Sequence, residues 1–232
     1  MVRISGGGLG RNPFGNVSAQ GQQKAQQSES VGQQMQSTLF GKKKPPILDE
    51  DDAQIAALMG RLHAYRKRLA RLAGDTEDDY DLVLSAGTIA MIDQDGLIYV
   101  GKEFLLGKSD DVACQVGVLA HEIGHRPKRW NEYKQERELT KEEAEKLART
   151  EETRADYFAG KALAELGLPV EPLCTFLRTI QTHPHPEYFS ADLRVECIQE
   201  GYDDGKRRSN NVAKFFPELA RMTGAKGDLG VG

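Results

Sequence analysis

A single apolar stripe runs through residues 50–73. Its members recur at alternating steps of three and four, the spacing that places side chains on one face of an α-helix. They are Ile55, Leu58, Leu62, Tyr65, Leu69 and Leu72. Basic residues lie mainly off this stripe, at Arg61, Arg66, Lys67, Arg68 and Arg71. We expect a core-packed helix that ends at Gly74 and has a solvated basic face, with a helix that docks on a membrane surface or an acidic partner as the alternative.

The hydrophobic period changes between residues 82 and 101. The apolar runs Ile89-Ala90-Met91-Ile92 and Leu97-Ile98-Tyr99-Val100 flank the segment Asp93-Gln94-Asp95-Gly96. An Asp-Gly pair between two apolar runs is a strong signal for a β-hairpin. The sequence therefore predicts two antiparallel strands, at about 88–92 and 97–101.

The chain from residue 110 onward has the pattern of successive helices. The first begins at Asp110 or Asp111, either of which can cap it, and ends before Pro127. Further helices are expected at about 170–181 and 190–201. Together with the hairpin, these helices predict an α+β fold that is mainly helical and carries a small antiparallel sheet.

Residues 140–167 carry clear signals for both ends of one long helix. Thr140 and Glu143 have the spacing of a capping box, in which each side chain accepts a hydrogen bond from a backbone N–H. Gly167 can adopt the left-handed conformation that ends many helices. We expect the helix to run from Thr140 to Leu166.

The two ends of the chain differ in composition from the middle. Residues 1–48 are rich in glycine and glutamine and carry six basic residues against the single acid Glu29. Such a segment buries too little apolar surface to offset the entropy of ordering it. The sequence therefore predicts a disordered basic tail over 1–48, a compact domain over 49–205 and a loose tail over 206–232.

Composition and charge exclude several function classes. The sequence has no apolar run of about 18 residues, so we expect no membrane-spanning helix, and it begins without the apolar segment of a secretory signal. Its net charge of −4 does not favour nucleic acid as a partner. Three scattered cysteines fit a reducing compartment. We expect a cytoplasmic protein, with non-classical export through the N-terminal tail as the alternative.

The segment His121-Glu122-Ile123-Gly124-His125 is the strongest chemical motif in the chain. Residues four apart lie on the same face of a helix, so His121 and His125 can reach one metal ion. Glu122 is rotated by about 100°, which places it beside the ion as a general base for a bound water. A buried helix whose histidines only form hydrogen bonds is the alternative interpretation.

A catalytic zinc ion needs a third protein ligand and an open fourth position. Glu152, which follows His125 by 27 residues, is the candidate. Asp156 lies one turn further on the same face, where it can accept the free N–H of a ligand histidine and hold the ring. Glu151 is the rival ligand, but the residue one turn after it is Ala155. The alternative is that these acids only solvate an exposed helix.

Several segments between residues 82 and 198 resemble, in the same order, the HtpX and CAAX prenyl protease family of zinc metallopeptidases, a gluzincin group. The similar segments are Ser85 to Val100, Asp110 to His125, Glu152 to Asp156, Ala164 to Pro169 with Phe176-Leu177, and Thr182 to Pro186 with Arg194. The stretch from Glu152 to Ala159 is also similar to a helix of intracellular regulatory peptidases that cleave repressors. Both groups use the same zinc chemistry.

The resemblance implies a zincin-like domain in which His121, His125 and Glu152 bind one zinc ion and Glu122 is the general base. It also implies that a protein or peptide substrate binds as an added strand at the edge of the sheet. Carried over to this chain, that edge is one of the strands of 88–101.

Within these strands, Ile98 and Tyr99 are the expected substrate contacts. A second donor usually helps a metal to stabilise the oxyanion that forms during hydrolysis. The candidates are His183, His185, Tyr188 and Arg194, among which we favour a histidine of the His-Pro segment, such as His185, or Arg194.

The sequence therefore predicts a zinc-dependent endopeptidase that hydrolyses peptide bonds through a zinc-bound water activated by Glu122. The alternative is a catalytically silent zinc-binding module with a regulatory or interaction role. Such a module could dock through the basic tail 1–48 or the helix 50–73. A tail that masks the cleft and keeps the enzyme latent is a further hypothesis.

Overall fold

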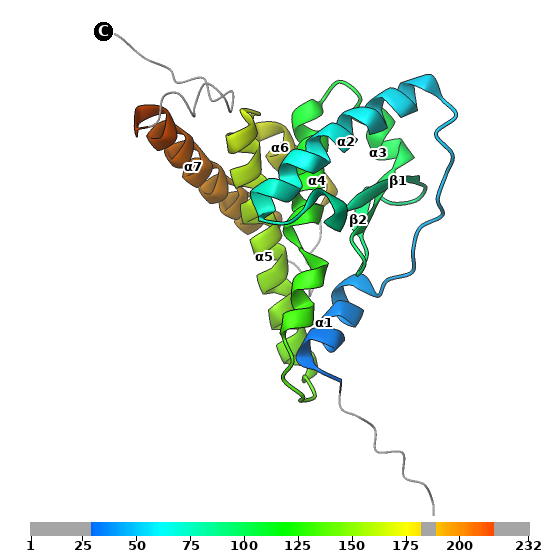
Figure 1. The fold of residues 1–232 in the computed structure, drawn as a ribbon, viewed down its shortest axis with the longest axis vertical. Coiled ribbons are helices and arrows are strands. Elements are labelled where there is room, and N and C mark those ends of the chain that lie inside the picture. The colour runs from blue at the N-terminus through cyan, green and yellow to red at the C-terminus, as the bar shows by residue number, and fades with distance from the viewer. Residues whose placement is uncertain (1–28, 182–188, 216–232) are drawn as a thin grey trace, which may run out of the picture.

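The computed structural model describes residues 29–181 and 189–215, and Figure 1 shows their arrangement. The helices are α1 (Val31–Phe40), α2 (Ala53–Ala73), α3 (Lys102–Gly107), α4 (Val112–Gly124), α5 (Lys141–Leu166), α6 (Glu171–Ile180) and α7 (Ala191–Phe215). The strands are β1 (Asp81–Ser85), β2 (Ala90–Ile92) and β3 (Leu97–Gly101), and two short 3-10 helices are η1 (Glu77–Asp79) and η2 (Pro127–Glu132). The predicted α+β class, mainly helical with a small sheet, is confirmed.

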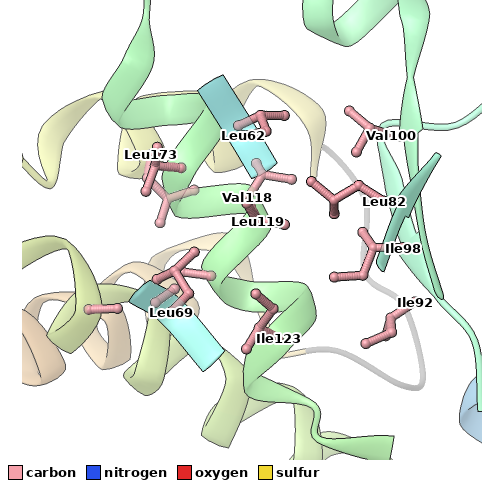
Figure 2. Packing of buried hydrophobic residues seen from close by; sticks show 14 of the residues in the cluster. Leu62, Leu69, Leu82, Ile92, Ile98, Val100, Val118, Leu119, Ile123 and Leu173 are labelled. Atoms are coloured by element: carbon pink, nitrogen blue, oxygen red, sulfur yellow. The ribbon is translucent and has the colours of Figure 1, made fainter. Parts of the chain in front are cut away.

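Helix α4 lies at the centre of the hydrophobic core. Its N-cap is Asp111, one of the two predicted caps, whose side chain accepts a hydrogen bond from the backbone N–H of Cys114. Figure 2 shows apolar side chains of α4, such as Ile123, gathered with Leu82 and Ile98 from the sheet. Because α4 is buried along most of its length, polar groups near its C-terminal end need partners from neighbouring elements.

Helix α2 confirms the helix predicted over 50–73. Asp52 caps its N-terminus, and Gly74 ends it in the left-handed conformation with φ +79°. Several of its basic side chains serve the fold: Arg61 donates to the carbonyl of Ser109 and to the side chain of Gln115. Fewer basic side chains of this helix are therefore free to bind an acidic partner or a membrane surface than the sequence suggests.

The sheet has three strands in the order β1-β3-β2. Strands β2 and β3 form the predicted antiparallel hairpin, in which Met91 pairs with Tyr99. Strand β1 pairs in parallel with β3, with Leu82 opposite Ile98. The prediction of a purely antiparallel sheet is therefore wrong, because the apolar run at 82–84 adds a parallel strand and makes β3 the central one.

Helix α5 has the predicted boundaries, with the Thr140–Glu143 capping box at its start and Gly167 at φ +71° after its end. It packs closely against α4 because Gly124 has no side chain. A Cβ atom at Gly124 would lie 3.0 Å from the Cα of Ala155. This close approach brings the acidic residues of α5 next to the histidines of α4.

The predicted N-terminal boundary at residue 48 is wrong. Residues 31–40 form α1, which begins with a capping box of Ser30 and Gln33 and packs against η2 and α5 (Figure 1). Met35 and Phe40 are buried, so this segment contributes apolar surface to the core in spite of its glutamines. Residues 1–28 lie outside the described part of the chain, and with them three of the six basic residues of the predicted docking tail.

The predicted C-terminal boundary at residue 205 is also wrong, because α7 continues to Phe215. Helices α5 and α7 approach so closely that a Cβ at Gly160 would lie 1.8 Å from the carbonyl oxygen of Ile198. Within the described ranges, no helix has both the length and the apolar character that crossing a membrane requires.

Candidate metal centre

Three predicted ligands meet where α4 crosses α5. His121, His125 and Glu152 each offer one ligand atom, and these atoms all lie within 4.8 Å of one another. Ligand atoms about 2.0–2.2 Å from a tetrahedral zinc ion lie roughly 3.4 Å apart. A small closure of the side chains would therefore bring all three donors onto one metal ion.

His121 lies between two carboxylates. Its Nδ1 lies 2.9 Å from Oδ1 of Asp156, and its Nε2 lies 3.2 Å from Oε2 of Glu152. Burial lowers the pKa of His121, but the two carboxylates outweigh burial and raise it to about 10. The same carboxylates would favour a cation placed between the rings and Glu152.

Glu152 is a buried carboxylate with incomplete hydrogen bonding. Its side chain is 9% exposed, and its Oε2 atom has no partner in hydrogen-bond geometry. Burial raises its pKa, but the positive charges of His125, His121 and Arg194 outweigh burial and hold the pKa below its usual value. A buried, ionised carboxylate that faces a histidine ring nitrogen at 3.2 Å has the surroundings that suit a metal ligand.

Asp156 holds His121 from the side away from Glu152, as predicted, and Arg194 of α7 holds Asp156. Nε and Nη2 of Arg194 donate to the two carboxylate oxygens at 2.7 and 2.9 Å. Nη1 of Arg194 donates to Gln181 at 3.1 Å. Nη2 of Arg194 also lies 3.8 Å from Oε2 of Glu152. Arg194 therefore supports Asp156 next to the cluster, and its role as an oxyanion donor stays a prediction.

Glu151, the rival ligand, points to a different partner. Nη2 of Arg129 in η2 donates to its Oε1 at 2.6 Å, and the Glu151 side chain is 1% exposed. Its Oε1 also lies 3.9 Å from Nδ1 of His125. The geometry therefore favours Glu152 over Glu151 as the third ligand, and Arg129 is a residue that the sequence analysis missed.

His125 is held differently from His121. Its Nδ1 is buried and has no hydrogen-bond partner among the described residues. The ring of Phe40 packs edge-on against it, with centroids 5.9 Å apart and an interplanar angle of 74°. Phe40 was not among the predicted site residues, because residues 1–48 were expected to form a disordered tail.

Glu122 projects from α4 towards the sheet. Its Oε2 accepts a hydrogen bond of 3.0 Å from the backbone N–H of Ile92 in β2. The carboxylate therefore lies between the histidine helix and the edge strand. The role of general base expected for Glu122 stays a prediction.

Ile98 and Tyr99 do not line the edge of the sheet. Both belong to β3, which pairs with β1 on one side and β2 on the other, and both are buried. Their backbone groups cannot accept an added strand, so the prediction of edge contacts at these two positions is wrong. The edge strand next to Glu122 is β2.

His183, His185 and Tyr188 lie outside the described residues. The described residues that flank this segment, Gln181 and Phe189, share a hydrogen bond from Nε2 of Gln181 to the carbonyl of Phe189. The role proposed for His185 stays a prediction.

Comparisons with known proteins do not assign the chain to a family. No family model matches it, and neither a curated protein nor a solved structure is similar enough to count as a match. The functional proposal therefore depends on the geometry of the cluster itself.

Proposed function

We propose that this protein is a zinc-dependent endopeptidase. The observation that carries the proposal is the convergence of ligand atoms from His121, His125 and Glu152 within 4.8 Å. Glu122 follows His121 on α4, and His125 is the C-cap of that helix. Two imidazoles and one carboxylate are a donor set of catalytic zinc sites. The buried carboxylate of Glu152, whose Oε2 faces Nε2 of His121 at 3.2 Å, supports the fit of a cation there.

Zinc bound to these three residues would act as a Lewis acid towards a peptide carbonyl, and it would lower the pKa of a bound water molecule to about 7. Glu122 supplies the proton transfer: its carboxylate accepts a proton from the attacking water and delivers it to the leaving amine. The N–H of Ile92 fixes the position of this carboxylate through the 3.0 Å hydrogen bond.

Asp156 and Arg194 support the ligands. Asp156 accepts from Nδ1 of His121, which leaves Nε2 of that ring directed at Glu152. Arg194 neutralises Asp156 and fixes its orientation through two hydrogen bonds. Neither residue needs to touch the substrate in order to matter for the reaction.

The substrate would bind as an extended peptide along β2. Asp93, the residue directly after β2, donates its N–H to the carbonyl of Leu97 in β3. In an antiparallel pair every second residue bonds to the partner strand, and the residues between them direct their backbone groups away from it. By this alternation the backbone groups of Ala90 and Ile92 face away from β3, and the N–H of Ile92 is the one that donates to Glu122. An added strand there would pass directly beside Glu122.

The test compares wild type with Glu122→Gln on a peptide library made from a digested proteome, with products identified by mass spectrometry. We expect wild type to cleave peptides and the variant to cleave none, while both bind one zinc ion per chain. The control is Glu142→Gln, an exposed glutamate on α5, which should cleave like wild type. Zinc bound by all three proteins with no cleavage by any would contradict the peptidase and favour the silent zinc-binding module.

A further inference from the structure

We propose that Phe40 is a positioning residue for His125, so that α1 forms a wall of the metal centre. This inference rests on the proposed function, because it concerns the metal that His121, His125 and Glu152 would share. It assigns a role to a segment, residues 31–40, whose composition resembles that of a flexible tail.

The two histidines differ in how their rings are held. Nδ1 of His121 has a carboxylate acceptor, Asp156, at 2.9 Å. In residues 29–181 and 189–215, Nδ1 of His125 finds no hydrogen-bond partner, and the carboxylate of Glu151 lies 3.9 Å from it and accepts from Arg129. Outer hydrogen bonds normally set the orientation of a ligand histidine. The orientation of the His125 ring must therefore be set by the side chains that pack around it.

Phe40 supplies that packing. It is the last residue of α1 and is 5% exposed, and its ring meets the imidazole of His125 edge-on. His121 contacts the same imidazole at a centroid distance of 4.8 Å and an angle of 84°. With two rings packed against it, the imidazole of His125 has little room to turn about its Cβ–Cγ bond.

Helix α1 is itself fixed at its far end. A Cβ at Gly32 would lie 2.0 Å from the carbonyl oxygen of Trp130, so the helix backbone fits directly onto η2. The side chain of Gln34 donates to the carbonyl of Arg137 and accepts from the N–H of Leu139. These contacts fix the place of Phe40, because a rigid helix transmits its position from Gly32 to its last residue.

The first experiment measures the zinc dissociation constant by chelator competition for the full-length wild type, Phe40→Leu and Phe104→Leu. Phe104 is the matched control: it is also buried, but it lies on α3 and packs against Phe176. We expect Phe40→Leu to weaken zinc binding about tenfold, a typical effect of losing an outer support of a ligand, and Phe104→Leu to leave it unchanged. The visible spectrum of the cobalt-substituted protein should change only in Phe40→Leu.

A second pair of variants keeps the inference falsifiable if Phe40→Leu does not fold. Phe40→Met preserves most of the buried volume, and Gly32→Ala displaces α1 without altering residue 40. Both should weaken zinc binding in the same direction. The double variant Gly32→Ala/Phe40→Met should bind zinc about as weakly as Phe40→Met alone, since both changes act through one ring.

Equal zinc affinity and an equal cobalt spectrum in wild type and in the folded Phe40 variants would overturn the role of Phe40 and leave the proposed function intact. A wild-type protein that binds no zinc would overturn the proposed function, and the inference with it. The two failures are therefore distinguishable from one data set.

Discussion

His121 and Asp156 are joined across the interface of α4 and α5 by a contact of 2.9 Å between Nδ1 and Oδ1. Asp156 is 1% exposed and also accepts two hydrogen bonds from Arg194. Burial raises the pKa of Asp156, but His121 and Arg194 outweigh burial and keep it below its usual value. The carboxylate is therefore a charged acceptor that sets the orientation of His121.

Replacing this acceptor should weaken the metal centre without removing a ligand. We expect Asp156→Asn to lower zinc affinity by about 10- to 100-fold, because an outer partner of a ligand histidine has effects of that size. Asp203→Asn, an exposed aspartate on α7, is the matched control and should bind zinc like wild type. Equal affinity in the two folded variants would contradict the role given to Asp156.

The pair of Arg129 and Glu151 should act on stability. Removing Arg129 leaves a buried carboxylate without its main partner, so Arg129→Met should cost about 3–5 kcal/mol in the free energy of unfolding, measured with urea. Arg154 lies 3.5 Å from the same carboxylate but is half exposed. Arg154→Met should therefore cost less than about 1 kcal/mol. A similar loss in the free energy of unfolding in both variants would show that the buried pair contributes no more to stability than the exposed arginine.

The N-terminal helix should contribute to the core. Met35 is fully buried on α1, so Met35→Ala should destabilise the protein by about 2–5 kcal/mol. Ser37→Ala, at an exposed position of the same helix, should change the free energy of unfolding by less than about 0.5 kcal/mol. Thermal or urea unfolding distinguishes these outcomes, and a Met35→Ala variant as stable as wild type would mean that α1 does not pack as described.

The stability of the protein should depend on pH through Asp93, in the turn before β3. Burial raises the pKa of Asp93, but hydrogen bonds from Lys44 and from the N–H groups of Leu97 and Asp95 outweigh burial and lower it. Its charge therefore stabilises the fold above the unfolded pKa of about 3.9, and this stabilisation is lost as the pH falls through the folded pKa. Wild type should be more stable than Asp93→Asn at pH 7, and the difference should shrink towards pH 3. A difference that does not change with pH would contradict the assignment.

Local signals were sufficient to predict the elements that carry the site. The capping residues Asp111 and Thr140 and the terminator Gly167 act within one helical turn of the boundaries that they set, so their effect can be inferred from spacing alone. The shared face of His121 and His125 follows from helix geometry in the same way. The preference for Glu152 over Glu151 also agrees with the structure, because one residue of helical rotation turns Glu151 towards Arg129.

Features that depend on tertiary contacts could not be predicted. The segment around Met35 has few apolar residues, and it becomes ordered because η2 and α5 offer it a surface. The apolar run at 82–84 does not by itself show which strand β1 pairs with, because its parallel pairing with β3 is a contact between separate segments. Once β1 is in place, Ile98 and Tyr99 lie on a central strand, which is why their predicted role at the edge was wrong.

The most direct test of the metal centre is the zinc content per chain, measured by elemental analysis of wild type, Glu152→Ala and the control Glu142→Ala after purification without chelators. We expect one zinc ion per chain in wild type and in Glu142→Ala, and a large loss in Glu152→Ala, because Glu152 is the proposed third ligand on α5. Wild-type protein without zinc, or a Glu152→Ala variant that keeps its full zinc content, would contradict the assignment of His121, His125 and Glu152 as the zinc site.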